Sequence, residues 1–150
     1  MPSTYTNLLY HIIFSTKDRR PLINPELQKE LHPYIGGIIR DAGGEPIEIG
    51  GIADHVHILA KLPATIAVAD ALRLIKSNFS KWAGERPDLV RLFAWQTGYA
   101  AFTVSKSQGG PVREYIQNQE RHHRRKTFEQ ELVSLLKKND IEYDERYLWD

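Results

Sequence analysis

Residues 47–62, IEIGGIADHVHILAKL, contain two short apolar segments separated by a few turn-forming residues. Residues 47–52 and 55–62 are rich in the β-branched and apolar side chains that strands favour. Gly50-Gly51 and Asp54 predict a tight connection between them, because these residue types tolerate the backbone angles of turns. Two strands that follow one another so directly form an antiparallel pair. This stretch therefore predicts a hairpin within a sheet.

Another strand and a helix precede this hairpin. Residues 5–15 (YTNLLYHIIFS) are rich in aromatic and β-branched side chains, which favours a strand that ends before Arg19-Arg20. Asn24-Pro25 then combines an N-cap residue with a proline in the first helical turn. A helix to about Asp41 follows, because its apolar residues recur with a 3.6-residue period and Gly43-Gly44 closes it.

The chain beyond the hairpin contains helices and one more strand. Thr65 is a candidate N-cap for a helix over residues 66–82, and Gly84 and Pro87 mark its end. Residues 89–95 fit neither a helical nor a strand pattern. The remaining predicted segments are a strand over residues 99–105, a helix from Pro111 through about Arg124, a helix over residues 128–138 capped by Thr127, and an irregular tail over residues 141–150.

The order of these segments, β-α-β-β-α-β followed by two helices, defines the expected architecture. It matches the split ferredoxin-like plan, so we expect an α+β fold with one antiparallel sheet and helices packed on one face. The C-terminal helix from Pro111 is added to this core. The other face of the sheet would then be free to hold a ligand or a partner. A chain of 150 residues is long enough for one such domain, spanning residues 1–150.

Composition excludes several classes of protein and site. The chain is 41% hydrophobic and 26% charged, which is ordinary for a globular protein. Cysteine is absent, so disulfides and thiolate metal sites are excluded, and any metal must be held by His, Asp, Glu, Gln or Asn. No apolar run reaches the length of a membrane span, and the first residues lack a signal pattern, so we expect a cytoplasmic protein. The net charge of +1 does not by itself indicate a nucleic-acid partner.

His55 and His57 are two residues apart in a predicted strand. Because strand side chains alternate between faces, both imidazoles point to one side and Val56 points to the other. Two imidazoles fixed on one side of a strand could form half of a metal site. A pair of surface or hydrogen-bonded histidines without a metal is the alternative that this spacing leaves open.

Tyr115 and Gln119 are four residues apart in the predicted helix, so they share one face. A tyrosine in an amphipathic helix is usually a packing residue, and its phenol, with an ordinary pKa of about 10, is seldom ionised. A metal ion bound to a target phosphate would make attack by the phenol feasible. If His55, His57 and the Gln119 amide oxygen hold that ion, the set favours transfer of a DNA strand from its 3′-oxygen to Tyr115.

Several motifs resemble those of the single-tyrosine HUH transposases of small bacterial insertion sequences. His55-Val56-His57 resembles the HUH motif, in which U is a bulky apolar residue, and Tyr115-x-x-x-Gln119 resembles the catalytic helix of that family. The resemblance also includes residues 10–17 (YHIIFSTK), 93–102 (FAWQTGYAAF), 115–123 (YIQNQERHH) and 143–149 (YDERYLW). It therefore covers nearly the whole chain.

The resemblance implies an activity that composition and spacing do not show. Family members act on single-stranded DNA, recognise imperfect hairpins near the ends of the element, and leave a 5′-phosphotyrosine and a free 3′-OH. Carried over to this chain, His55, His57 and Gln119 would hold Mg²⁺ or Mn²⁺, and Tyr115 would be the nucleophile. The resemblance also implies a homodimer, often with the tyrosine helix of one subunit completing the site of the other.

A DNA partner requires cationic groups for its phosphates. His122 and His123 titrate near neutrality and could assist proton transfer or phosphate binding. Trp82 and Trp95 are better placed in the core than on a DNA-stacking surface. The candidate DNA contacts, each of which is also compatible with solvated surface, are Lys17, Arg19, Arg20, Arg73, Lys76, Arg113, Arg121 and Arg124.

Other functions are compatible with parts of this pattern. The histidine-triad hydrolases also begin with His-x-His, but the next position of that motif is Leu59 here, which removes the third histidine. Relaxases and rolling-circle nickases share the chemistry but usually carry larger or differently ordered domains. A domesticated relative that binds and processes repeated genomic hairpins would have the same residues. A catalytically silent DNA-binding protein would need none of the four residues His55, His57, Tyr115 and Gln119.

Overall fold

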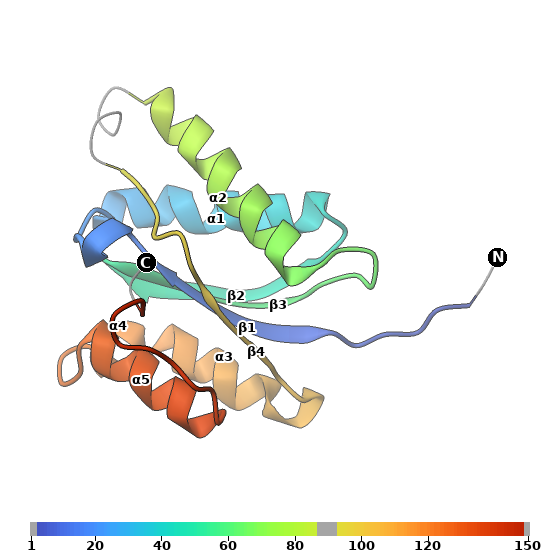
Figure 1. Cartoon of the computed structure of the whole chain (residues 1–150). Coiled ribbons are helices and arrows are strands. Elements are labelled where there is room, and N and C mark those ends of the chain that lie inside the picture. Colours follow the sequence, from blue (N-terminus) through green and yellow to red (C-terminus); the bar gives the residue numbers. More distant parts are fainter. Residues whose placement is uncertain (1–2, 87–92, 149–150) are drawn as a thin grey trace.

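A four-stranded antiparallel sheet in the order β2-β3-β1-β4 forms the centre of the computed structural model, which describes residues 3–86 and 93–148 (Figure 1). This order is that of a ferredoxin-like sheet, so the predicted α+β class and its β-α-β-β-α-β core are confirmed. The strands are β1 (Leu9–Ser15), β2 (Glu45–Ile52), β3 (His55–Lys61) and β4 (Ala100–Thr103).

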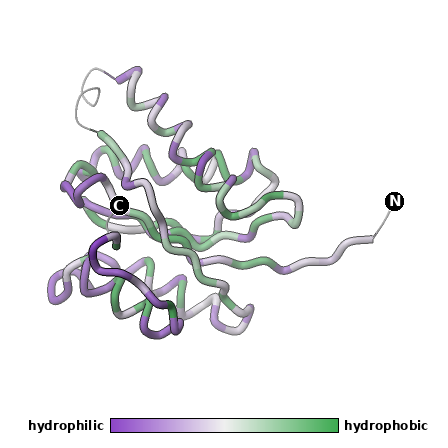
Figure 2. The backbone as a smooth tube through the Cα atoms, viewed as in Figure 1, coloured by the Kyte–Doolittle hydropathy of each residue, from purple (hydrophilic) through white to green (hydrophobic). Residues whose placement is uncertain are grey.

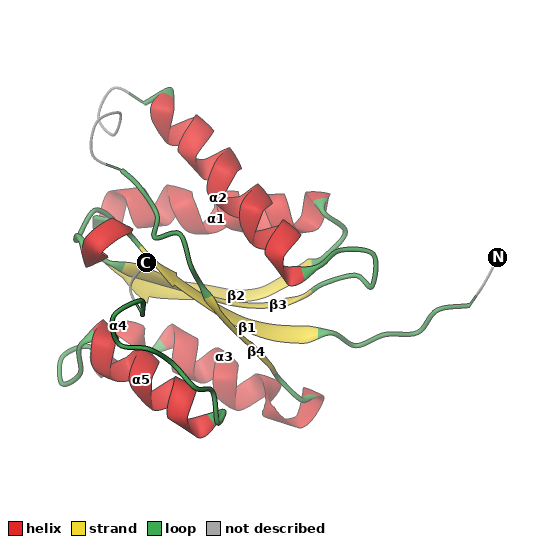
Figure 3. Ribbon diagram, in the orientation of Figure 1, coloured by secondary structure: helices red, strands yellow, loops and turns green. Residues whose placement is uncertain are grey.

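Helices cover both faces of this sheet (Figure 3). The first face carries α1 (Pro25–Asp41) and α2 (Val68–Gly84). The second carries α3 (Gly109–Gln117), α4 (Gln119–His122) and α5 (Phe128–Lys138). The expectation of a free second face is therefore wrong. That face is partly apolar, with Ile13 and Phe102 packed against Leu132 and Leu136 of α5, so the hydrophobic effect favours covering it.

Alternation along the strands divides the core between the two faces. On β3, Val56 and Ile58 belong to the core beneath α1 and α2, together with Phe14 of β1. His55 and His57 point to the opposite face, as the spacing predicted. The sheet therefore has one largely apolar face and one face on which apolar side chains surround a polar centre.

Local sequence signals explain where several helices begin. The side chain of Asn24 accepts a hydrogen bond from the Leu27 N–H at 2.7 Å, which confirms the predicted cap of α1. Thr127 and Gln130 form a reciprocal capping box at the start of α5. The predicted cap Thr65 is wrong, because residues 64–66 form a turn and α2 begins at Val68, after Ala67.

The helix predicted from Pro111 through Arg124 is not continuous. It is divided at Asn118, whose φ and ψ angles are −101° and 22°. The Asn118 side chain donates to the Glu114 carbonyl at 2.9 Å, and such local bonds compete with the helical ladder. Tyr115 therefore lies in α3 and Gln119 begins the short helix α4.

The other helices and strands in the structure differ from the predicted ones by a few residues at their ends. β1 begins at Leu9, and Tyr5 is 91% exposed, while β4 is shorter than residues 99–105. Two short 3-10 helices lie at Lys17–Arg19 and Lys106–Gln108. Residues 141–148 are irregular, as predicted.

The predictions for Pro87, residues 89–92 and Trp149 lie outside the described residues. Within the described ranges, no helix has the length and apolar character needed to cross a membrane.

Candidate active site

His55 and His57 lie two residues apart on β3 and are both fully buried. A polar neighbour fixes each ring through Nδ1. Nδ1 of His55 lies 2.7 Å from Oδ1 of Asp54, and Nδ1 of His57 lies 2.8 Å from Nε2 of His11 on β1. The two Nε2 atoms are consequently the ones directed at the centre of the site, as in metal-binding histidines whose other nitrogen is held by a partner.

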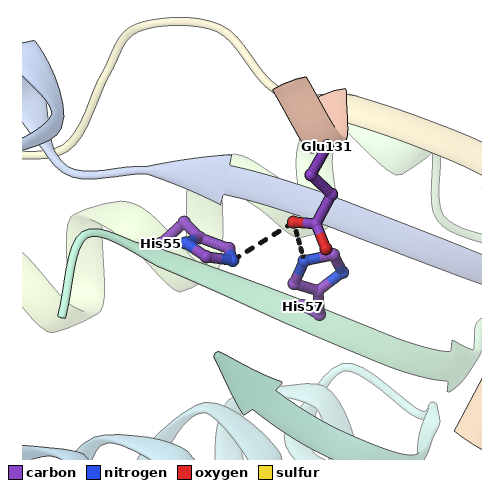
Figure 4. A group of neighbouring side chains, drawn as sticks. All are labelled: His55, His57 and Glu131. Atoms are coloured by element: carbon purple, nitrogen blue, oxygen red, sulfur yellow. Dashed lines mark hydrogen bonds and ion pairs between the residues drawn. The ribbon is translucent and has the colours of Figure 1, made fainter. Parts of the chain in front are cut away.

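Glu131 of α5 reaches down to both histidines (Figure 4). Its Oε1 lies 2.9 Å from Nε2 of His57 and 3.3 Å from Nε2 of His55, and the residue is 1% exposed. One donor atom from each of these three buried residues lies within 4.8 Å of the others. The group of His55, His57 and Glu131 could therefore hold a metal ion.

Tyr115 and Gln119 meet the same carboxylate although α3 and α4 are separate helices. The Tyr115 hydroxyl donates to Oε2 of Glu131, and the Gln119 amide nitrogen donates to that oxygen at 3.0 Å. The Gln119 amide oxygen lies 2.9 Å from Nε2 of His55. The four residues predicted from the sequence as nucleophile and ligands, Tyr115, His55, His57 and Gln119, are thus gathered around Glu131.

The two histidines that follow Gln119 also contact the site. Nε2 of His123 lies 3.1 Å from Oε1 of Gln119 and 3.2 Å from Oε1 of Glu131. The ring of His122 stacks on Tyr115 with a centroid distance of 4.6 Å and an interplanar angle of 29°. His122 therefore restricts the tyrosine ring, and His123 adds an imidazole to the polar centre.

Burial and charge act in opposite directions on the titrating groups. Burial lowers the pKa of His55, but hydrogen bonds to Asp54 and Glu131 outweigh it and raise that pKa to about 9. For His57, burial prevails and lowers the pKa to about 4. Burial would raise the pKa of Glu131, but the hydrogen bonds from His123, His55 and His57 hold it well below its usual range.

The tyrosine hydroxyl is held in its protonated form in this arrangement. Burial, followed by the charge of Glu131 and the hydrogen bond to it, raises the pKa of Tyr115 above its ordinary value. A phenol in this state is a weak nucleophile unless its target is activated. To act as a nucleophile, Tyr115 would therefore need a bound group that polarises its target.

The donor set is chemically suitable for such a group. It offers two imidazole nitrogens, a carboxylate oxygen and the Gln119 amide oxygen. Mixed nitrogen and oxygen donors of this kind bind divalent transition ions, and the carboxylate and amide oxygens also suit Mg²⁺ and Mn²⁺. Because Asp54 and His11 already hold the Nδ1 atoms, the ligand nitrogens are oriented before any ion binds.

A cationic pocket of about 530 Å³ lies next to Tyr115. It is formed where the chain passes from α4 to α5, a connection that Figure 2 shows as strongly hydrophilic. Among the described residues, no acidic side chain forms an ion pair with any of its four cations. The lining residues are Tyr115, Arg121, His122, Arg124, Arg125 and Lys126.

Two of the predicted DNA contacts lie on the opposite face of the sheet, on α2. Arg73 forms an exposed ion pair with Asp70 of the same helix. Lys76 donates to the backbone carbonyls of Gln96 at 2.9 Å and Gly98 at 2.8 Å, and burial lowers its pKa to about 8. Lys76 therefore stabilises the segment that leads into β4, at a distance from Tyr115.

The other predicted contacts are on the surface. Arg19 pairs with Glu129 at 2.9 Å, and Arg113 pairs with Glu48 at 3.0 Å. Lys17 and Arg20 are exposed on either side of Arg19. Of the eight predicted cations, Arg121 and Arg124 are the two that line the pocket beside Tyr115.

Glu131, His11 and Asp54 were not predicted from the sequence as residues of the site. Glu131 carried a usable signal, because it lies three residues after Phe128 and beside Leu132, on the apolar stripe of α5. A carboxylate on an apolar stripe must find a polar partner when the stripe is buried. His11 lies on the same face of β1 as Ile13, but the sequence does not show that it would lie next to His57.

Comparison with known proteins points to one family of transposases. The family model described as "Transposase IS200 like" matches residues 4–119. The ISDra2 transposase TnpA of Deinococcus radiodurans is 26% identical over 117 residues, covering 75% of this chain and 84% of that protein. The transposase of insertion sequence element IS200 from Salmonella typhimurium is 26% identical over 121 residues, covering 77% of this chain and 79% of its relative.

Solved structures share the fold. A crystal structure of a candidate transposase from Deinococcus radiodurans R1 has a TM-score of 0.62 and 22% identity, and the match covers 79% of this chain and 95% of that one. A REP-associated tyrosine transposase bound to a REP hairpin has a TM-score of 0.62 and 17% identity, covering 82% and 73%. The family model spans well over half of the sequence, and the chain therefore belongs to the IS200-like transposase family.

Proposed function

We propose that this chain cleaves and rejoins single-stranded DNA at hairpin-bearing element ends through a covalent bond between Tyr115 and a 5′-phosphate. One observation carries the proposal. The Tyr115 hydroxyl and the imidazoles of His55 and His57 contact the two oxygens of one carboxylate, so the nucleophile and the metal donors form a single centre. A tyrosine that only fills space in the core would not need its hydroxyl next to the buried histidines.

The chemical step is a transfer that consumes no water. The Tyr115 oxygen forms a bond to phosphorus while the bond from phosphorus to the 3′-oxygen breaks. The phenol gives up its proton, and the departing 3′-oxygen gains one, so a free 3′-OH remains. Because the phosphodiester is exchanged for a phosphotyrosine of similar energy, attack by a 3′-OH can reverse the step and join strands.

The site would hold Mg²⁺ or Mn²⁺ through His55, His57 and Gln119, the residues that the family resemblance implies. A bound divalent cation would supply charge neutralisation at the phosphate and polarise it toward attack. The residues of the chain orient the reaction. His122 stacks on the Tyr115 ring and fixes its plane, while α3 holds the hydroxyl against the centre.

The DNA strand would enter over the cationic pocket beside Tyr115. Arg121, Arg124, Arg125 and Lys126 can neutralise phosphates there, and the lack of acidic partners among the described residues leaves their charge available. The hairpin bound to the REP-associated transposase supports a hairpin substrate for this chain, because the two proteins share the fold. The surface cations Lys17, Arg19, Arg20 and Arg113 remain candidate contacts for the hairpin stem, and Arg73 and Lys76 of α2 are less favourably placed.

We propose that cleavage takes place within one chain, whether or not the protein forms the homodimer that the resemblance implies. Tyr115 contacts Glu131 of its own chain, and its ring centroid lies 5.8 Å from that of His57. Mixing Tyr115→Phe with His57→Ala tests this arrangement. Restored cleavage in the mixture would mean that the tyrosine acts in the site of a partner subunit.

The test of the function uses oligonucleotides that carry hairpins from the DNA flanking the gene. Wild-type protein with Mn²⁺ should give a protein–DNA adduct that survives denaturation and disappears with EDTA. Tyr115→Phe should bind the same DNA without forming the adduct. Hairpin binding by the wild type with no adduct on any flanking sequence would instead favour a catalytically silent binding protein, and a domesticated role would appear as cleavage of repeated genomic hairpins.

A further inference from the structure

We propose that Glu131 is a functional residue of this centre, as an anionic ligand of the cation and as the anchor of the Tyr115 hydroxyl. The inference rests on the proposed function and adds a residue outside the stretch from 4 to 119 that the family model matches. It makes α5 part of the active site in this chain.

The surroundings of Glu131 are unusual for a buried carboxylate. It is 1% exposed, and among the described residues no lysine or arginine forms an ion pair with it. Its partners are His55, His57 and His123 on one oxygen, and Tyr115 and Gln119 on the other. Burying a carboxylate is costly unless a cation or several hydrogen bonds compensate it. A divalent cation among these imidazoles would add to the compensation that these hydrogen bonds already provide.

The two oxygens of Glu131 divide these contacts. Oε1 lies 2.9 Å from Nε2 of His57 and 3.3 Å from Nε2 of His55, on the side of the metal donors. Oε2 accepts hydrogen bonds from the Tyr115 hydroxyl and from the Gln119 amide. One rigid carboxylate therefore fixes the spacing between the nucleophile and the cation. Such spacing matters because reactivity falls steeply when reacting groups are displaced.

The helix that carries Glu131 is well anchored. The capping box of Thr127 and Gln130 fixes its first turn, and the Phe128 ring stacks on His55 with centroids 4.4 Å apart. Leu132 and Leu136 pack in the core on the same face of the sheet. Because both its beginning and its apolar stripe are held, α5 presents Glu131 to β3 in one position.

The charge of Glu131 distinguishes it from the expected ligand set. His55, His57 and Gln119 would offer a divalent cation two nitrogens and a neutral oxygen. Glu131 adds one negative charge directly to that set, which increases affinity for a doubly charged ion. Its removal should therefore weaken metal binding even when DNA is absent.

The experiment measures Mn²⁺ affinity of the full chain by EPR, without DNA. Glu131→Gln keeps the shape and removes the charge, and we expect affinity to fall on the order of 100-fold, the upper end of the effect of losing a group that merely supports a ligand. Glu131→Asp keeps the negative charge but moves it away from the site, because the side chain is shorter by one methylene group. We expect this variant to lose less Mn²⁺ affinity than Glu131→Gln. Glu129→Gln, at an exposed position on the same helix, is the matched control and should bind as the wild type does.

A second measurement separates the two roles. Adduct formation by Glu131→Asp is followed at saturating Mn²⁺ on the oligonucleotide that the wild type cleaves. If Glu131 also anchors Tyr115, we expect the rate to stay about tenfold or more below that of the wild type after the metal site is filled. Full recovery would overturn the anchoring role, and wild-type Mn²⁺ affinity in both Glu131 variants would overturn the ligand role. Loss of Mn²⁺ binding in His57→Ala with no effect at Glu131 would leave the proposed function intact.

Discussion

Gly50→Ala tests the packing that positions Tyr115, the proposed nucleophile. Gly50 lies on β2 directly opposite His57 of β3, so a side chain there would point to the same face of the sheet. A methyl group at this position would meet the Ile116 carbonyl oxygen at 2.5 Å and the Ile116 Cγ2 at 2.8 Å. Ile116 follows Tyr115 in α3. The added carbon therefore presses on the backbone of the helix that carries Tyr115.

These distances determine how much stability and reaction rate Gly50→Ala should lose. A separation of 2.5 Å is about 0.9 Å short of ordinary contact, which begins at 3.4 Å, and a helix backbone cannot rotate away as a side chain can. Overpacking of this kind costs about 1–3 kcal/mol, which exceeds the gain of roughly 0.5–1 kcal/mol from replacing a strand glycine. A displacement near 1 Å can slow a positioned reaction by about 100-fold.

Urea unfolding and single-turnover adduct formation measure the two consequences. Gly50→Ala should lower the free energy of unfolding and slow adduct formation. Mn²⁺ affinity should be less affected, because of the four proposed ligands only Gln119 lies near Ile116 in the chain, while His55, His57 and Glu131 belong to β3 and α5. Gly37→Ala is the matched control, because its new methyl group meets nothing within 4 Å, and it should be stabilising by up to about 1 kcal/mol. Wild-type stability and cleavage in Gly50→Ala would refute the packing of α3 on β2.

Three further predictions concern the pocket and the metal centre. Replacing Arg124 and Arg125 by glutamine should lower the slope of log affinity for single-stranded DNA against log salt, by about 0.7 for each phosphate that the variant no longer neutralises. His11→Ala should weaken Mn²⁺ binding by about 10–100-fold, because His57 loses the partner of its Nδ1. The cation must displace a proton from His55, whose pKa is about 9, while His57, with a pKa of about 4, is already neutral. Mn²⁺ affinity should therefore rise roughly tenfold per pH unit between about pH 5 and 8 in calorimetric titrations.

A matched variant or a specific result can contradict each of these three predictions. Replacing Lys29 and Arg40 of α1 by glutamine removes the same charge from the opposite face of the sheet and should leave the salt slope unchanged. An equal reduction of the slope in both double variants would mean that the pocket attracts DNA through net charge alone. Metal affinity independent of pH would show that His55 is neutral before the ion binds, and wild-type affinity in His11→Ala would show that His57 needs no support.

Much of the architecture could be predicted from the sequence because short-range signals determine it. The alternation around Val56 placed His55 and His57 together on one face, and Asn24 and Thr127 marked the starts of two helices correctly. Periodicity did not reveal the break at Asn118, because a side-chain bond to the Glu114 carbonyl, and not an apolar pattern, decides it. The shortened β1 likewise reflects pairing, since the register of β1 with β3 and β4 does not extend to Tyr5, although that residue type favours strands.

The candidate site was harder to predict because its centre is assembled by tertiary contact. His55, His57, Tyr115 and Gln119 follow from spacing and from resemblance, and the structure brings them together. Glu131 comes from a helix whose place over the second face depends on the packing of Leu132 and Leu136 against the sheet. No local pattern in the sequence states that α5 would cover this face.

The chemical identity of the protein–DNA linkage tests the proposed tyrosine chemistry most directly. Wild-type protein, Mn²⁺ and a cleavable hairpin oligonucleotide would be combined, the adduct digested with trypsin and nuclease, and the peptides sequenced by mass spectrometry. We expect a nucleotide 5′-phosphate on Tyr115, within the tryptic peptide of residues 114–121, EYIQNQER. A nucleotide on any other residue, or cleaved DNA with no modified peptide, would contradict it.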